Sequence, residues 1–139
     1  MSDGSDGIEV GAGPPPRTFG PLTRAMFVRY AGASGDFNPI HYDEGFAKSA
    51  GFPTVFSQGM HQAALLAGFA VDWLGPENVR RFLVRFREQV WPDDVLTCTG
   101  SVSGIEERDE GRMVTVDLQC TRQTGGVAIV GSADFLLPR

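Results

Sequence analysis

The second half of the chain alternates between apolar and polar positions. Over residues 79–91 one face carries mostly charged or polar side chains, and the apolar face comprises Phe82, Val84, Phe86 and Val90. Alternation with a period of two is typical of a strand that is buried on one side. Shorter runs follow at 95–102, 114–121 and 127–137, and Gly125-Gly126 is a hairpin turn signal before the last of them. The sequence therefore predicts four long strands, with a polar loop at 106–111.

One segment is apolar nearly all round. Residues 59–74 contain no charged side chain before Asp72, and small alanines alternate there with large side chains such as Leu65 and Trp73. A helix of this kind has to be buried on most of its sides. We expect it to be the central helix of the fold.

Two shorter helices and a first strand are predicted upstream. Residues 17–22 fit the strand, and Thr23 is a candidate N-cap for a helix that ends near residues 32–35. The apolar stripe of this helix comprises Met26, Phe27, Tyr30 and Ala31. Asp43 is a candidate N-cap for a second, short helix, which Gly51-Phe52-Pro53 ends.

Length and N-terminal composition predict the domain organisation. A chain of 139 residues fits one domain with a sizeable core. Residues 1–16 consist mainly of Gly, Ser, Asp and Pro, and they have too little apolar surface to offset the entropy of ordering, so we expect a mobile leader. Residues 17–139 then form one α+β domain, in which an antiparallel sheet wraps the buried helix.

Composition and charge exclude several functions. The net charge of −5 argues against a nucleic-acid partner, because phosphate binding requires clustered Lys and Arg. Cys98 and Cys120 lie outside any Cys/His cluster, and no metal-ligand spacing or cofactor motif occurs, so we expect neither metal nor cofactor. No apolar run reaches the ~18 residues of a membrane span, and no signal peptide is recognisable. We expect a cytoplasmic protein without membrane contact.

Residues 31–60 combine an acid, a histidine and the start of the buried helix. Asp36 and His41 flank Asn38-Pro39, which favours a turn because Asn tolerates unusual backbone angles and Pro fixes φ. The two side chains can therefore fold back towards each other. An Asp and a His that share a cavity can act as base and acid. The alternative is that Asp36 only caps a turn, while His41 makes one hydrogen bond in a surface loop.

Gly59 stands at the predicted start of the buried helix. A helix N-terminus offers unpaired N–H groups and the positive end of the dipole, which suit an oxygen that gains negative charge in a transition state. A glycine there lets a ligand approach the backbone closely. The alternative is a tight junction between loop and helix.

These residues also resemble a known family. The motif comprises GDFNPIH at 35–41, then Asp43, Ala47, Gly51-Phe52 and Ser57-Gln58-Gly59-Met60. It is similar to the hydratase motif of MaoC-like proteins, the (R)-specific enoyl-CoA hydratases and related 3-hydroxyacyl dehydratases, and the resemblance runs from about Phe19 to the C-terminus. The resemblance implies the hot-dog fold and homodimers joined edge to edge.

The resemblance also implies a reaction, the reversible hydration of trans-2-enoyl thioesters of coenzyme A or an acyl carrier protein to (R)-3-hydroxyacyl thioesters. Asp36 and His41 would hold one water, with the carboxylate as base for the attack on the β-carbon and the imidazole handling the proton at the α-carbon. The Gly59 N–H would stabilise the enolate oxygen. Asn38 would orient the loop or contact this dyad. We expect substrate contacts at Asn38, Phe56, Gln58 and Met60.

Several positions stay open. Gln58 stands where many relatives carry His, and Ala67 stands where some carry a polar side chain. His61 could point into the acyl pocket, or lie on the helix surface or at an interface. A group of arginines could bind coenzyme A phosphates or an acidic carrier protein, or form a solvated strand face; it comprises Arg80, Arg81, Arg85 and Arg87.

Two competing functions are weighed against the hydratase. Hot-dog thioesterases usually carry a carboxylate on the central helix, and none lies between Gly59 and Val71. Non-catalytic acyl-binding subunits of heteromeric hydratases typically lack the Asp or the His, whereas this chain has both. A catalytic subunit that needs an unlike hot-dog partner is a further alternative.

Overall fold

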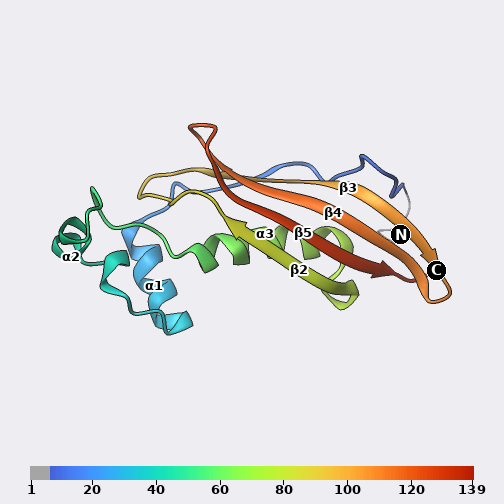
Figure 1. The fold of residues 1–139 in the computed structure, drawn as a ribbon, viewed down its shortest axis with the longest axis horizontal. Helices are drawn as coiled ribbons and strands as arrows, with labels where there is room; N and C mark the ends of the chain where they lie inside the picture. Colours follow the sequence, from blue (N-terminus) through green and yellow to red (C-terminus); the bar gives the residue numbers. More distant parts are fainter. Residues whose placement is uncertain (1–6) are drawn as a thin grey trace.

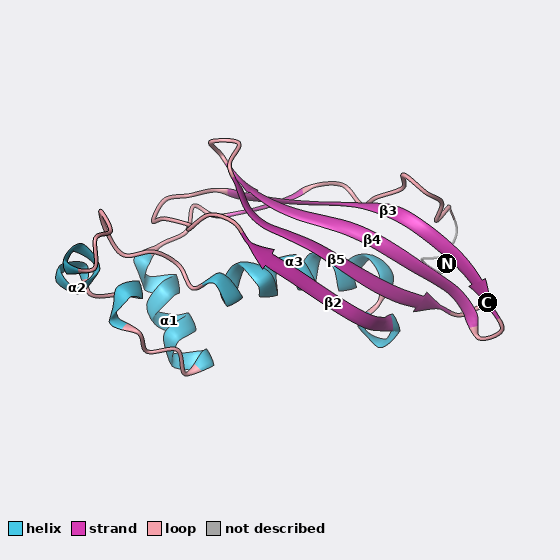
Figure 2. Cartoon of the chain, in the orientation of Figure 1, coloured by secondary structure: helices cyan, strands magenta, loops and turns pink. Residues whose placement is uncertain are grey.

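A computed structural model describes residues 7–139. Its strands form one antiparallel sheet in the order β1-β3-β4-β5-β2. The strands are β1 Arg17–Phe19, β2 Val79–Phe86, β3 Leu96–Arg108, β4 Gly111–Arg122 and β5 Val127–Leu137. The helices are α1 Arg24–Ser34, α2 Glu44–Ser49 and α3 Gly59–Leu74, with the 3-10 turns η1 Pro39–His41 and η2 Pro76–Asn78. The sheet and helices are drawn in Figures 1 and 2.

Helix α3 lies along the concave face of the curved sheet (Figure 1), and it contacts β2, β3, β4 and β5. Its Leu66 and Phe69 are at most 2% exposed, and they belong to one core with Val116 and Phe135 of the sheet. The helix has the predicted bounds, 59–74. Its sequence is apolar on most sides, so the helix is stable only when it is buried, here against the sheet. This α+β arrangement is the hot-dog fold, as predicted.

Helices α1 and α2 lie beyond the end of the sheet, next to the N-terminal end of α3 (Figure 1). The predicted caps begin both helices: Thr23 Oγ1 accepts from the Met26 N–H at 3.2 Å, and Asp43 Oδ1 accepts from the Phe46 N–H at 3.1 Å. Helix α1 ends before Gly35, which adopts the left-handed conformation with φ 79°. The loop that follows α1 is thereby turned back towards α3.

The predicted polar loop at 106–111 is wrong, because β3 continues to Arg108 and β4 begins at Gly111. Glu107 pairs with Arg112 across the two strands, with 3.2 Å between the charged groups. The end of β3 is exposed from Glu106 to Arg108, so it carries polar side chains as a loop would. Polarity alone could not separate the two structures.

Strand β2 ends at Phe86, five residues before the predicted end at Trp91. The chain then leaves the sheet edge: the Arg87 N–H still donates to Ala128 O at 2.8 Å, but Val90 O accepts from the Ser57 N–H at 2.8 Å. Val90 is buried as predicted, at 1% exposure, although it packs from a loop. The alternating pattern therefore extends past the strand itself.

Residues 8–12 of the expected leader lie beside strand β3, while residues 1–6 lie outside the described part of the chain. The Gly11 N–H donates to Val102 O at 2.9 Å, and the Val102 N–H donates to Ala12 O at 2.8 Å. Ile8 is 8% exposed, and the Arg112 guanidinium donates to its carbonyl oxygen at 3.0 Å. The cause is that β1 is too short to satisfy the outer edge of β3, so the leader backbone extends the pairing.

The two cysteines, Cys98 on β3 and Cys120 on β4, face each other in the strand register, and both are buried free thiols. Both belong to the hydrophobic core. Within residues 7–139, no helix is long and apolar enough to cross a membrane.

Candidate active site

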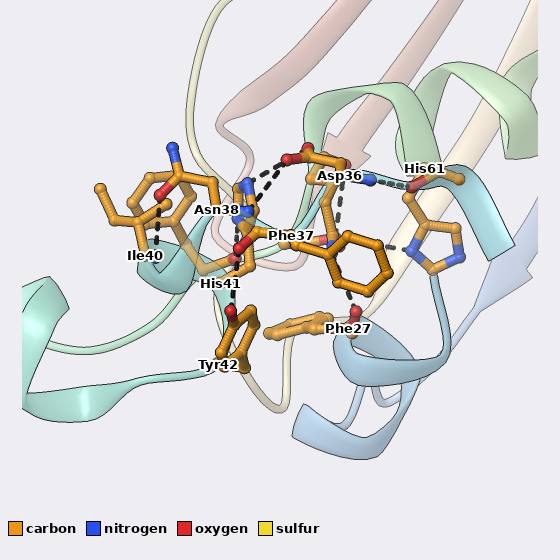
Figure 3. Close-up of polar contacts among 12 residues, drawn as sticks. Phe27, Asp36, Phe37, Asn38, Ile40, His41, Tyr42 and His61 are labelled. Carbon is orange, nitrogen blue, oxygen red and sulfur yellow. Dashed lines mark hydrogen bonds and ion pairs between the residues drawn. The ribbon is translucent and has the colours of Figure 1, made fainter. Parts of the chain in front are cut away.

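The loop between α1 and α2 brings Asp36 and His41 together, as predicted. Asn38 caps the turn η1, because its Oδ1 accepts from the Ile40 N–H at 3.1 Å, and Pro39 begins that turn. The turn swings His41 back, so that its Nε2 lies 3.5 Å from Asp36 Oδ2. Figure 3 shows the carboxylate of Asp36 facing the imidazole ring. Asn38 thus orients the loop, which is one of the two roles considered for it.

A backbone carbonyl fixes the tautomer of His41. Its Nδ1 lies 2.8 Å from Phe56 O, which can only accept, so Nδ1 carries a proton and donates. The ring of Phe56 meets the imidazole edge-on, with 5.3 Å between centroids. His41 is 8% exposed, whereas the Asp36 side chain is 47% exposed. Proton exchange at His41 is therefore confined to Nε2, on the side of the carboxylate.

Short-range hydrogen bonds hold the carboxylate of Asp36. Asp36 Oδ1 accepts from the backbone N–H of Asn38 at 3.4 Å. The backbone N–H of Asp36 donates to Ser34 Oγ at 3.1 Å. The Tyr42 hydroxyl donates to Phe37 O at 2.8 Å and closes the other side of the loop. Asp36 does cap a turn, as the alternative interpretation holds, but its second oxygen is left to face His41.

Gly59 is the first residue of α3, so its N–H has no partner within the helix. Gln58 at the N-cap makes no side-chain hydrogen bond to the first turn. A Cβ atom at Gly59 would lie 2.9 Å from the ring of Phe86, so the close approach to the Gly59 Cα is made by Phe86. Gly59 is therefore both a tight junction between loop and helix and a residue whose N–H is not used by a helical hydrogen bond.

Two of the expected substrate contacts lie elsewhere. Gln58 is fully buried, and its amide nitrogen donates to Phe27 O of α1 at 2.8 Å, which ties α1 to the start of α3. Its Oε1 has no hydrogen-bond partner among residues 7–139. Met60 is 59% exposed, and it does not line the cavity described next.

A cavity of about 270 Å³ lies beside Gly59. Its walls comprise Phe56, Ser57, Gly59, Gln62, Phe86, Arg87, Glu88, Gln89 and Val90. Phe56 and Gly59 are predicted site residues. Asp36 and His41 do not line the cavity, and they connect to it through Phe56, whose carbonyl oxygen accepts from His41.

Ser57 and Gln62 are polar residues of this cavity that are not among the expected site residues, although Ser57 belongs to the family motif. They are 3% and 2% exposed, and the Gln62 amide nitrogen donates to Ser57 Oγ. The signal available in the sequence was a glutamine one turn after Gly59, inside a helix whose other polar side chains are only His61 and Asp72.

His61 lies between α1 and α3. Its ring stacks on Tyr30 with 5.0 Å between centroids, and its Nδ1 lies 3.5 Å from Ser57 Oγ. Burial lowers the pKa of His61, because the charged form loses hydration there. The ring of His61 therefore packs between α1 and α3, and it does not line the cavity beside Gly59.

Comparisons with known proteins agree with the geometry. The family model for the MaoC like domain matches residues 9–124. The chain is 32% identical to an (R)-specific enoyl-CoA hydratase of Rhodospirillum rubrum over 120 residues, which cover 84% of this chain and 81% of that protein. It is 44% identical over 78 residues to 3-hydroxyacyl-thioester dehydratase X of Mycobacterium tuberculosis, covering 55% of this chain.

The chain spans only part of some relatives. The match covers 27% of 3-hydroxyacyl-thioester dehydratase X, and 6% of the fatty acid synthase beta subunit hexB of Dothistroma septosporum, to which it is 34% identical. Among solved structures, the (R)-hydratase of A. caviae involved in PHA biosynthesis superposes with a TM-score of 0.83 at 26% identity. That superposition covers 96% of this chain and all of the other. The chain therefore belongs to the MaoC-like dehydratase family.

Proposed function

We propose that the chain catalyses the reversible hydration of trans-2-enoyl thioesters to (R)-3-hydroxyacyl thioesters. One observation carries the proposal: Nε2 of His41 faces Asp36 Oδ2 at 3.5 Å, while Nδ1 is committed to Phe56 O. An acid and a base are thus presented together, with only one ring nitrogen free to exchange a proton. The names of the relatives, an enoyl-CoA hydratase and a 3-hydroxyacyl-thioester dehydratase, support the same reaction class.

The dyad can carry out both proton transfers of the hydration. Asp36 acts as a carboxylate, and His41 acts in the form that carries a proton on each ring nitrogen. Asp36 takes a proton from the water as the water oxygen bonds to the β-carbon, and His41 gives the proton on Nε2 to the α-carbon while it keeps the one on Nδ1. The proton now on Asp36 then passes to Nε2 across the 3.5 Å separation, which restores the starting state. Dehydration follows the same steps in reverse.

The enolate formed between these steps requires a hydrogen-bond donor. The Gly59 N–H is such a donor, since it has no helical partner and no side chain caps the first turn of α3. It also stands at the positive end of the helix dipole. Bonding to the thioester oxygen there favours the transition state over the ground state, because the negative charge develops on that oxygen.

The remaining predicted contacts take supporting roles in this proposal. Asn38 holds the loop that carries the dyad, and Phe56 presents its carbonyl oxygen to His41 and its side chain to the cavity. Gln58 sets the distance between α1 and α3. Met60 is exposed near the start of α3, and in this proposal it contacts the acyl group or a second subunit.

The test follows the absorbance of the conjugated thioester when purified protein is added to crotonyl-CoA and to longer trans-2-enoyl-CoAs. Absorbance should fall, and the product should be oxidised by an (R)-specific but not by an (S)-specific 3-hydroxyacyl-CoA dehydrogenase. Release of free thiol in the same incubation would favour the thioesterase. No turnover with any chain length or carrier, in a folded protein, would contradict the proposal.

We further propose a homodimer joined through β2. Among residues 7–139 this strand pairs only with β5, so it is an edge of the sheet, and its Leu83 and Phe86 are 50% and 55% exposed. An exposed apolar edge is a surface that a second copy can cover. Native mass measurement of the chain expressed alone should give twice its mass of 15.0 kDa. An unstable, inactive monomer would point instead to an unlike hot-dog subunit.

A further inference from the structure

One peptide group connects His41 to the chain that follows β2. The carbonyl oxygen of Phe56 accepts from His41 Nδ1 at 2.8 Å, and the N–H of the same peptide group, which belongs to Ser57, donates to Val90 O at 2.8 Å. A peptide group is planar, so bonds at both of its ends fix its orientation. The rings of Phe56 and Trp91 also meet edge-on, with 5.7 Å between centroids. The chain after β2 therefore holds the acceptor that meets the imidazole.

The peptide group between Val90 and Trp91 is held in the same way. Its carbonyl oxygen accepts from the Ser57 N–H, and its own N–H donates to Asp94 Oδ2 at 2.8 Å. Two peptide groups and three hydrogen bonds thus connect the imidazole of His41 to a carboxylate in one series. Every donor in the series is a backbone N–H or the Nδ1–H, and every acceptor is a carbonyl or carboxylate oxygen. The direction of each bond is therefore fixed.

Asp94, which ends the series, lies in the loop between β2 and β3 and is 3% exposed. The Arg122 guanidinium donates to both of its oxygens, at 2.8 Å and 3.3 Å, and the Gln123 amide nitrogen donates to Oδ1 at 2.6 Å. Burial raises the pKa of Asp94, but hydrogen bonds from Arg122, Trp91 and Gln123 outweigh it, so the pKa lies below its usual value. The series therefore ends on an ionised carboxylate that is held at the end of β4.

All three hydrogen bonds of the series run in one direction, from His41 towards Asp94. Hydrogen bonds in series polarise one another, so each is stronger than it would be alone. A carboxylate attracts the Trp91 N–H more strongly than a neutral acceptor does, and this leaves more negative charge on Val90 O and then on Phe56 O. The Nδ1–H consequently meets a stronger acceptor than an isolated carbonyl group.

We propose that Asp94 is a positioning residue for His41, which it reaches through these two peptide groups. The inference rests on the proposed function, in which Nε2 exchanges a proton while Nδ1 keeps its own. A strong and fixed acceptor at Nδ1 holds the imidazole plane, and that plane directs Nε2 towards Asp36 at 3.5 Å. Asp94 thereby does through the backbone what a directly bonded carboxylate does for the histidine of a catalytic triad.

The test labels histidine with ¹⁵N and follows the Nδ1–H proton of His41 by NMR. The chain has two histidines, so the signal that is lost in His41→Ala is assigned to this ring. Asp94→Asn removes the charge but keeps an oxygen for the Trp91 N–H. The Nδ1–H signal should move upfield in Asp94→Asn, because a weaker acceptor deshields the proton less. A signal at the wild-type position would overturn the inference.

Glu88→Gln is the matched control, because Glu88 is a second carboxylate that Arg122 engages, at 3.2 Å. Both substitutions remove one negative charge beside the same guanidinium, but of the two carboxylates only Asp94 accepts from the Trp91 N–H. The Nδ1–H signal of Glu88→Gln should therefore stay at the wild-type position. An equal upfield movement in both variants would contradict the specific role of Asp94.

The series also has a test from the His41 end, for the case in which Asp94→Asn does not fold. His41→Ala removes the first donor, so the remaining bonds should weaken. The amide protons of Ser57 and Trp91 should move upfield, with the smaller movement at Trp91. The amide proton of Leu22 donates to the backbone oxygen of Asp94 at 2.9 Å, outside the series, and should stay. Unchanged signals of Ser57 and Trp91 would refute the series.

Kinetics separates positioning from a loss of stability. Asp94 does not line the cavity beside Gly59, so Asp94→Asn should lower kcat for crotonyl-CoA about 3- to 10-fold, the range for one neutral hydrogen bond, with KM little changed. A variant that is less stable but has the wild-type kcat per folded molecule would overturn the positioning role. A moved Nδ1–H signal in a protein without hydratase activity would support the series and count against the proposed function alone.

Discussion

The body of the molecule and the segment that carries the site are held together by different forces. In the body, α3 and the sheet bury apolar side chains such as Leu66, Phe69 and Phe135. The segment 36–62 instead relies on caps, turns and side-chain bonds to the backbone. Of the five buried polar residues described, four belong to this segment, namely His41, Ser57, Gln58 and Gln62. Changes in the body should therefore affect stability, whereas changes in the segment should affect chemistry.

The largest effect on stability is expected in the body. Leu66→Ala removes a fully buried side chain of α3 and leaves a cavity under the sheet, so the free energy of unfolding should fall by about 2–5 kcal/mol. Urea unfolding measures this loss. Activity per folded molecule should change little. A variant that keeps full stability but loses most of its activity would contradict the division between the two regions.

The largest effect on chemistry besides the dyad is expected at Gly59. Gly59→Pro removes the N–H group but suits the first position of a helix, and Gln58, with φ −68° and ψ 131°, already has the conformation favoured before proline. We expect kcat to fall about 10²- to 10³-fold, as for the loss of one oxyanion donor. Steady-state kinetics with crotonyl-CoA measures it.

Gly59→Ala is the matched control for that change. It adds the same Cβ atom near the Phe86 ring but keeps the N–H, so any displacement of that ring is common to both variants. Gly59→Ala should therefore retain most of the activity that Gly59→Pro loses. Equal losses in the two variants would favour the tight-junction interpretation of this glycine.

A smaller effect is expected at Asn38, where one side chain serves both regions. Asn38→Ala removes the cap of η1 and should cost about 1 kcal/mol of unfolding free energy. The turn positions His41, so kcat should fall as well, while KM changes less. Thermal unfolding and kinetics on the same preparation measure both. Asn38→Ser keeps a capping oxygen and should recover part of each loss.

The smallest effect is expected at Glu44, which joins Arg24 and Thr54 beside the site loop. Hydrogen bonds from Arg24 and Thr54 lower the pKa of Glu44 to about 2 from its usual 4.5. A lowered folded-state pKa contributes stability above the unfolded pKa, and this contribution is lost as the pH falls towards 2. Glu44→Gln should thus be slightly less stable than wild type at pH 7.

The pH series provides the check on Glu44. Urea unfolding of Glu44→Gln and wild type should differ at pH 7, and the difference should shrink from pH 4.5 to pH 2. The group is exposed, so added salt should reduce the difference at pH 7. A difference that persists at pH 2 would show that packing, and not charge, is what the substitution alters.

The body could be predicted from sequence because one pattern governs each of its elements. The apolar run at 59–74 gives the bounds of α3, and period two gives the positions of β2, β4 and β5. The pattern failed at Glu106 and Glu107, because polar side chains are found both in loops and in exposed strands. These two residues belong to an exposed strand. It also missed the pairing of the leader with Val102, which depends on an edge left open by a distant strand.

The site could be predicted only in part. The spacing of Asp36, Asn38 and His41 is local, so turn chemistry was enough to bring the dyad together. The bonds from Gln58 to Phe27 and from Gln62 to Ser57 depend on how α1, the loop and α3 pack, and no spacing in the chain encodes that packing. The tautomer of His41 also depends on packing, because Phe56 O is fifteen residues away.

The central claim is that Asp36 and His41 act as one unit. The most direct test is kcat/KM for crotonyl-CoA in wild type, Asp36→Asn, His41→Ala and the double variant, with Asp72→Asn, an exposed carboxylate paired with Arg17, as control. We expect each single variant to lose at least about 10²-fold, and the double variant to lose scarcely more than either, with the control unchanged. Losses that multiply in the double variant, or single variants as active as wild type, would contradict the account.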